Sequence, residues 1–284
     1  MRAGSGQSMP VSLSAALTTW QFEPLVAAPT AVLAGCYVAA GWRCGRRRAR
    51  SWPFVRTLAF LSGLSAIIVA TESWVGVQDD TSLADHMVQH LLLIMVAPPL
   101  LIVGRPVTLL LHTVRNPWHT RVKRIVRSRF IRALTWPPTG LAVYAAAVLG
   151  THLTGLLLAD GAAHDAEHFL YVAAGYLYFL PVIGSEPISW RMSALGRYLL
   201  LLAAMPADIV TGAVLMLHGP LGPYAGADVQ AAGVIMLAGS ELIMTGLAVV
   251  LAAAAVTRRT RPAPQPEDLA AYNAYLASLG AREV

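Results

Sequence analysis

The sequence predicts an all-α membrane protein with seven transmembrane helices, its N-terminus outside and its C-terminus in the cytoplasm. Three observations lead to this prediction. Of 284 residues, 56% are hydrophobic and 13% are charged, which is too little charge to cover a soluble domain of this length. The apolar runs approach the ~20 residues that cross a bilayer. The basic residues fall in alternate loops, which is the pattern that sets orientation in a membrane.

The predicted spans follow one another through a transmembrane domain of residues 24–256. They are Pro24–Trp42, Phe54–Val77, His86–Gly104, Trp136–Leu158, Ala166–Ile183, Tyr198–Leu217 and Ala231–Val256. Residues 1–23 are expected to form an external segment and residues 257–284 a cytoplasmic tail. The apolar stretch Arg105–Thr113 is too short to cross again, and we expect a tail on the third helix or an interfacial segment.

The distribution of basic residues supports this topology. With these spans, 20 of the 21 lysines and arginines fall on one side of the membrane, and only Arg2 falls on the other. By the positive-inside rule, the basic side is cytoplasmic. The net charge of +6 thus reflects orientation, and we expect no nucleic-acid partner. Cys36 and Cys44 form no CxxC pair, so neither a structural disulfide nor a thiolate metal site is expected.

Histidines gather at one predicted depth. Six of the eight lie in the outer half of the membrane domain: His86, His90, His152, His164, His168 and His218. Within each of the pairs His86/His90 and His164/His168, the residues are four apart and share one helix face. Imidazole is the commonest transition-metal ligand, so two facing pairs could hold one or two ions of copper, zinc or iron. A single interfacial histidine can merely bond water or backbone, but this clustering favours a metal or heme site.

Other polar and sulfur side chains lie near these histidines in the sequence. Asp85, Asp165 and Glu167 flank the two pairs and could orient the imidazoles. Met87 lies beside the first pair, and a thioether favours Cu(I), although methionine more often only packs.

Two acids stand in the middle of predicted helices. Asp208 lies in the sixth helix and Glu241 in the seventh. A charge at such depth costs ~2.5–3.5 kcal/mol, so both should face the bundle interior. They could hold a cation or a proton, or join helices by hydrogen bonds. Pro98–Pro99 in the third helix and Pro206 in the sixth predict kinks.

Several sequence stretches resemble one known family. They are HMVQHLLLIMVAPPLLIVGRP (His86–Pro106), HDAEHFLYVAAGYLYFLPVIGSEP (His164–Pro187), LLLLAAMPADIVTGAVL (Leu199–Leu215) and DVQAAGVIMLAGSELIM (Asp228–Met244). The chain resembles, over roughly residues 25–256, the polytopic CtaG-type assembly proteins found with caa-type cytochrome c oxidases. The resemblance implies a multi-pass protein of the bacterial cytoplasmic membrane that helps to mature a heme-copper oxidase by handling copper, with oxidase subunits as its partners.

The residues and the resemblance together give one hypothesis. His86, His90, His164 and His168 form the main ligand set for copper, as Cu(I), on the outer side. His152 and His218 are secondary ligands, and Asp208 and Glu241 form a polar floor. Copper, supplied for example by an external chaperone, passes to the oxidase by ligand exchange rather than by enzymatic chemistry. The sequence leaves homo-oligomer formation open.

Three other functions stay open from the sequence alone. The first is a b-type cytochrome with histidine-ligated heme, against which the one-sided clustering of the histidines argues. The second is a proton or cation transporter that uses Asp208 and Glu241, although the cytoplasmic halves of the helices carry few polar residues. The third is an assembly scaffold that binds no metal.

Overall fold

The structure, a computed structural model, describes residues 18–47, 51–78, 81–153, 162–187 and 190–259. Within these ranges the regular structure is helical, apart from an isolated bridge between Leu221 and Tyr224. The helices are α2 (Pro24–Arg47), α3 (Phe54–Glu72), α4 (Trp74–Gln78), α5 (Leu83–Leu91), the π-helix η1 (Leu92–Val96), α6 (Ala97–Val103), α7 (Pro106–Thr113), α8 (Trp118–Val126), α9 (Arg129–Leu134), α10 (Pro137–Leu153), α11 (Ala162–Ile183), α12 (Ala194–Leu217) and α13 (Gly226–Arg259).

Within the part of the chain that the structure describes, six helical stretches are long and apolar enough to cross a membrane. They are Pro24–Arg46, Phe54–Gln78, Leu83–Thr113, Ala163–Ile183, Ala194–Leu217 and Gly226–Thr257. The protein is therefore a multi-pass helical membrane protein, as the sequence predicts. The predicted fourth span corresponds to α10, of which 17 residues are described, and its predicted C-terminal part, residues 154–158, lies outside the described residues. The predicted fourth span, which would bring the total to seven, and the orientation of the chain remain predictions.

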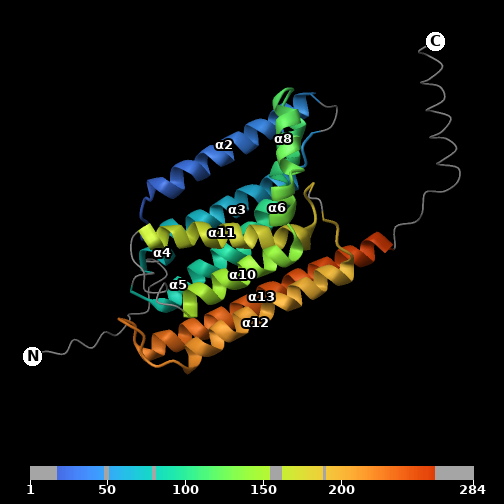
Figure 1. The fold of residues 1–284 in the computed structure, drawn as a ribbon. Helices are drawn as coiled ribbons and strands as arrows, with labels where there is room; N and C mark the ends of the chain where they lie inside the picture. The colour runs from blue at the N-terminus through green and yellow to red at the C-terminus, as the bar shows by residue number, and fades with distance from the viewer. Residues whose placement is uncertain (1–17, 48–50, 79–80, 154–161, 188–189, 260–284) are drawn as a thin grey trace, which may run out of the picture.

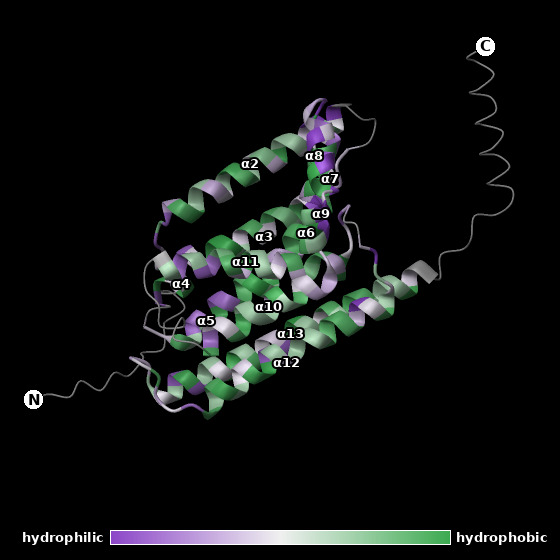
Figure 2. Ribbon diagram, viewed as in Figure 1, coloured by the Kyte–Doolittle hydropathy of each residue, from purple (hydrophilic) through white to green (hydrophobic). Residues whose placement is uncertain are grey.

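The long helices run side by side (Figure 1). At one edge, α2 packs on α3 and α7, and at the opposite edge α12 and α13 form an antiparallel pair. Between these edges lies the third span, made of α5, η1 and α6, in contact with α3, α11 and α13. Most residues of the long helices are hydrophobic, whereas α8 and the end of the bundle near α5 carry hydrophilic ones (Figure 2).

Two prolines explain the π-helical turn in the third span. Pro98 and Pro99 have no N–H group. The Ile94 carbonyl therefore cannot accept a hydrogen bond from residue 98, as it would in an α-helix, or from residue 99, as it would in a π-helix. The chain widens just before them, and Ala97 N–H donates to Leu92 O, five residues back. The sequence predicts a kink at this point, and the structure shows how the prolines are accommodated.

Gly175 of α11 packs directly on this turn. A Cβ atom at Gly175 would overlap the carbonyl oxygen of Ile94 and would lie 2.8 Å from Pro98 Cγ. Real Cβ contacts are never this short, so only glycine lets the two backbones come this close. This contact sets the distance between α11 and the third span.

A buried acid holds the opposite end of the third span. The stretch predicted as a tail or interfacial segment is the separate helix α7, which follows a left-handed residue, Arg105 (φ 55°). Glu186 Oε1 accepts a hydrogen bond from Val107 N (2.9 Å), and Oε2 accepts from Thr108 N (3.0 Å) and Thr108 Oγ1 (2.6 Å). The carboxylate thus satisfies the free N–H groups at the start of α7 and complements the helix dipole.

Stability should depend on pH through Glu186. Burial raises the pKa of this carboxyl above its ordinary value of 4.5, although the hydrogen bonds from Thr108 and Val107 oppose the shift. An acid with a raised folded-state pKa binds more protons folded than unfolded, so its contribution to stability falls as the pH rises through 4.5 toward that raised value. We therefore expect Glu186→Gln to flatten the pH profile of the melting temperature above pH 4.5. A profile parallel to that of the unsubstituted protein would contradict this.

Candidate metal site

The start of α5 is fixed from another helix. Asp228, in the first turn of α13, accepts hydrogen bonds from Leu83 N (2.7 Å), Ala84 N (3.3 Å) and Ser82 Oγ (3.3 Å). These bonds satisfy N–H groups that would otherwise be unpaired at the helix end. One turn later, Gln89 Nε2 donates to the carbonyl of Ala70 in α3 (3.1 Å). Together these bonds fix the position of the turns that carry His86 and His90.

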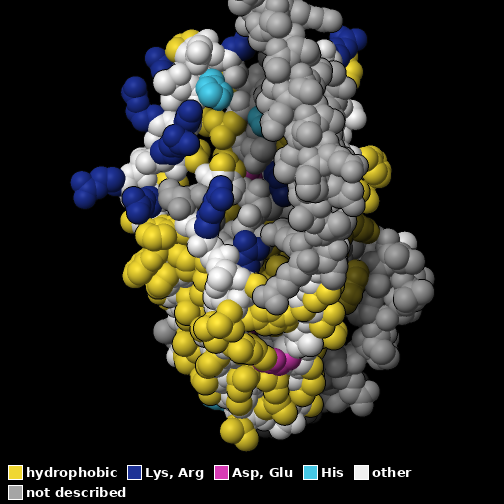
Figure 3. Space-filling view, turned by 90° about the vertical axis from the view of Figure 1, so that its right-hand side faces the viewer, with side chains coloured by type: hydrophobic (Ala, Val, Ile, Leu, Met, Phe, Trp, Pro, Cys, Tyr) yellow, Lys and Arg dark blue, Asp and Glu magenta, His cyan; other side chains and the backbone are white. Residues whose placement is uncertain are grey.

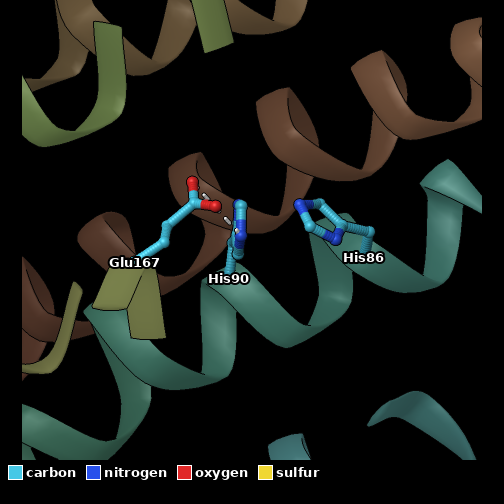
Figure 4. Close-up of side chains that lie close together, drawn as sticks. All are labelled: His86, His90 and Glu167. Carbon is cyan, nitrogen blue, oxygen red and sulfur yellow. Dashed lines mark ion pairs between the residues drawn. The ribbon is translucent and has the colours of Figure 1, made fainter. Parts of the chain in front are cut away.

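Three side chains converge at this end of the bundle. His86 and His90 project from α5, and Glu167 reaches toward them from α11 (Figure 4). Each offers one ligand atom, and these atoms lie within 4.8 Å of one another. All three residues are buried, with exposed fractions of 3%, 0% and 6%. This is the kind of arrangement that can hold a metal ion.

The hydrogen bonds of His152 determine which nitrogen of His90 is available. His152 Nδ1 lies 2.7 Å from the carbonyl oxygen of Val148. Because a carbonyl only accepts, Nδ1 carries the proton and Nε2 of neutral His152 is an acceptor. His90 Nδ1 lies 3.3 Å from this Nε2 and therefore donates to it. Neutral His90 then presents the lone pair of its Nε2, as metal-ligating histidines do when a second partner holds the other nitrogen.

His90 Nε2 points at a carboxylate oxygen. It lies 3.7 Å from Glu167 Oε1. Both atoms are buried, and among the described residues neither has a hydrogen-bond partner. A nitrogen lone pair and a carboxylate oxygen repel each other, and leaving buried polar atoms unsatisfied costs free energy. A cation between them would remove both penalties, so these donors fit a metal ion by their chemistry.

His164 and His168 lie between this group and a cavity. The His164 ring stacks on the His86 ring with centroids 5.3 Å apart, and the His168 ring lies 4.3 Å from that of His164. His164 Nδ1 is 4.0 Å from Glu167 Oε2. Both histidines line a cavity of about 230 Å³ that Gln89 and Asp165 also line. The two predicted histidine pairs therefore meet, although in unequal roles: the α5 pair is buried, and the α11 pair faces the cavity.

The other predicted site residues lie in different surroundings. His152 lies behind His90 and uses both ring nitrogens in hydrogen bonds, which suits it to orienting His90. His218 is the exposed C-terminal cap of α12. Asp208 is fully buried and accepts hydrogen bonds from Tyr144 OH (3.0 and 3.2 Å). Glu241 on α13 lies near enough to Asp208 for their charges to interact.

The sequence predicts a smaller role for Glu167 than its position in the structure allows. It predicts Glu167 only as a side chain that orients the histidines, whereas the structure places it among the potential ligand atoms. The spacing of residues in the sequence indicates this position. Glu167, Tyr171, Ala174 and Tyr178 recur at helical spacing, and the structure buries all four on one face of α11. Tyr171 on this stripe stacks on the His90 ring at 4.2 Å. A polar residue at the end of a buried stripe points into the core.

The fold and the cluster together define a class of protein: a multi-pass helical membrane protein with a buried histidine–carboxylate group near one end of its bundle. Residues 35–258 match the model of the cytochrome c oxidase caa3 assembly factor family. The chain belongs to this family, as its resemblance to the CtaG-type proteins predicts.

Three mycobacterial proteins are similar in sequence. Uncharacterized protein Mb0105 of Mycobacterium bovis and uncharacterized protein MT0111 of Mycobacterium tuberculosis are each 33% identical over 220 residues, which is 73% of this chain and 33% of theirs. Uncharacterized protein ML1998 of Mycobacterium leprae is 31% identical over 214 residues, 70% of this chain and 32% of its own. The chain thus spans about a third of the length of these relatives. No solved structure matches it.

Proposed function

We propose that this protein takes part in the assembly of a heme-copper oxidase by binding copper at His86, His90 and Glu167 and passing it on by ligand exchange. The observation that carries the proposal is the buried contact between His90 Nε2 and Glu167 Oε1, 3.7 Å apart, in which neither atom has a hydrogen-bond partner among the described residues. Membership of the assembly-factor family supports a role in oxidase assembly, and the two imidazoles and the carboxylate support the binding of a metal ion.

The surroundings of the site suit transfer rather than permanent storage. Three protein donors leave coordination positions to a partner's ligands, which is what ligand exchange requires. His164 and His168, between the cavity and the buried donors, offer further imidazoles on the way in or out. Imidazole nitrogens suit copper, and the carboxylate would neutralise the charge of a bound Cu(I) ion. In our proposal the ion is cargo, and its acceptor is an oxidase subunit.

We propose that the cavity opens on the outer side of the membrane. The histidine cluster lies where α11 and the third span begin and α3 ends, and the arginines Arg56 and Arg197 lie at the opposite end of the helices. The positive-inside rule puts the arginine end in the cytoplasm. Copper would then be accepted and released on the outer face, for which labelling of a single cysteine placed in the 218–225 loop, in a chain without Cys36 and Cys44, is a direct check.

The metal content of the purified chain tests the copper site. After copper loading under reducing conditions and washing in mild detergent, we expect about one copper ion per chain, because the described residues contain one such ligand group. His86→Ala/His90→Ala/Glu167→Ala should lose it. The matched control is His112→Ala/His119→Ala, in α7 and α8, which removes two histidines away from the cluster and should retain the metal.

Each outcome has a clear meaning. Copper lost only in the cluster variant supports the proposal, and copper lost equally in both variants indicates adventitious binding. Folded protein that takes up no copper rejects the metal site and leaves an assembly scaffold. A Soret absorption band in the purified protein would instead indicate the heme alternative.

A further inference from the structure

Three arginines from separate parts of the chain line one cavity at the end of the bundle opposite the histidines. Arg56 belongs to the first turn of α3, Arg105 precedes α7, and Arg197 belongs to the first turn of α12. The cavity measures about 510 Å³. Lys and Arg side chains gather on this face of the molecule, and a broad hydrophobic area covers the lower part of the same view (Figure 3).

The arginines are held by the fold around the cavity. Arg197 Nη1 donates to the carbonyl of Ile183 (3.2 Å) and passes over Gly184, where a Cβ atom would lie 2.6 Å from Arg197 Nη2. The Arg56 guanidinium lies 4.7 Å from the ring centre of Trp52. Arg105 occupies the left-handed turn between α6 and α7. Each guanidinium thus starts from a defined backbone position, which lowers the entropy lost when a ligand binds.

The remaining walls of the cavity are largely apolar. Val103, Ile183 and Leu251 line it together with Ala254 and Ala255, near the ends of membrane-crossing helices. Among the described residues that line it there is no Asp or Glu. The nearby acid Glu186, whose charge interacts with Arg105, uses both carboxylate oxygens at the start of α7. The cavity therefore combines concentrated positive charge with a hydrocarbon-like wall.

We infer that this cavity binds an anionic phospholipid, with the phosphate on Arg56, Arg105 and Arg197 and an acyl chain along the end of α13. Guanidinium groups match phosphate oxygens in pairs of hydrogen bonds. Basic pockets between transmembrane helices on the cytoplasmic side are suited to anionic headgroups. The apolar wall favours a lipid over free phosphate, because free phosphate gains nothing from Leu251 or Ala254. This inference does not depend on copper binding.

Lipid retention by the full-length chain tests the inference. In mild detergent, native mass spectrometry should show phosphatidylglycerol retained at one saturable site and phosphatidylcholine not retained. Arg56→Gln/Arg105→Gln should weaken retention roughly 30-fold, because each basic residue near the surface contributes about a factor of five. Arg56→Lys/Arg105→Lys keeps the charge and should restore part of it. The matched control, Arg121→Gln/Arg124→Gln on exposed α8, removes the same charge elsewhere.

Three results would overturn the inference. Equal loss in the α8 control would indicate general attraction to the basic surface. Equal retention of phosphatidylcholine would exclude recognition of a net negative charge. Displacement of the lipid by millimolar inorganic phosphate, with phosphate alone binding as tightly, would indicate a free-anion site. Thermal unfolding of every variant in the same detergent identifies any variant that fails to fold.

Discussion

Glu167→Gln should lower copper affinity about 100-fold while leaving the fold intact. The amide keeps the size of the side chain but removes the negative charge that faces His90 Nε2 at 3.7 Å. Even groups that only orient metal ligands change affinity by about 10- to 100-fold, and a direct donor should reach the upper end of that range. Titration with a competing Cu(I) chelator measures the change.

Asp165→Asn is the matched control for this substitution. Asp165 precedes Glu167 by two residues on α11, is exposed, and lines the cavity beside His164 and His168 rather than the buried donor group. The same loss of charge should therefore leave affinity nearly unchanged. If both variants lost affinity equally, the cavity would act only by attracting cations, and Glu167 would not be a ligand.

Gly175→Leu should have the largest effect on stability. Its side chain would have to occupy the space of the Ile94 carbonyl, which is backbone and cannot turn aside. Overpacking of a close contact costs about 3 kcal/mol or more when backbones must separate. Because Glu167 lies two turns away on the same helix, separation of α11 from the third span should also move the carboxylate away from the histidines. We expect a lower melting temperature and a lower copper content.

Gly246→Ala provides the control for Gly175→Leu. Gly246 lies within α13, and a Cβ atom there would meet nothing within 4 Å. Alanine at an open helical position should leave the melting temperature unchanged or raise it slightly. If Gly175→Leu had the same melting temperature as the unsubstituted protein, this would show that Gly175 is not in close contact with the Ile94 carbonyl.

The helical fold could be predicted from the sequence because each long apolar run forms a helix in a membrane independently of its neighbours. Lipid offers the backbone no hydrogen bonds, so a run such as that of α12 has to form a helix whatever it packs against. Boundaries are harder to predict, because they depend on partners distant in the sequence. The third helix begins at Leu83 and not at His86, since Asp228 from α13 satisfies its first N–H groups.

The site could be predicted only as far as helical spacing allows. Spacing places His86 beside His90 and His164 beside His168, but it cannot tell which pair faces the core. The structure buries the first pair and leaves the second at a cavity, because Glu167 and not His164 continues the buried stripe of α11. His218 shares the predicted depth of the cluster, yet it caps the end of α12 and is exposed. Residues at the same depth in the membrane can lie far apart within the membrane plane, so depth alone does not identify a binding site.

The π-helical turn has a consequence for the phase of the third span. A turn of this kind contains about one residue more than an α-turn, so everything before it is rotated by roughly 100° relative to an uninterrupted α-helix. A single helical wheel drawn for Leu83–Val103 therefore gives the wrong relative direction for side chains before and after the π-helical turn. If Leu92–Val96 were α-helical with the same number of residues, both histidines would turn away from Glu167, whereas deletion of one residue from this turn would let a regular α-helix keep them in nearly their present direction. The π-helical turn between His90 and Pro98 thus gives the histidines their direction toward Glu167.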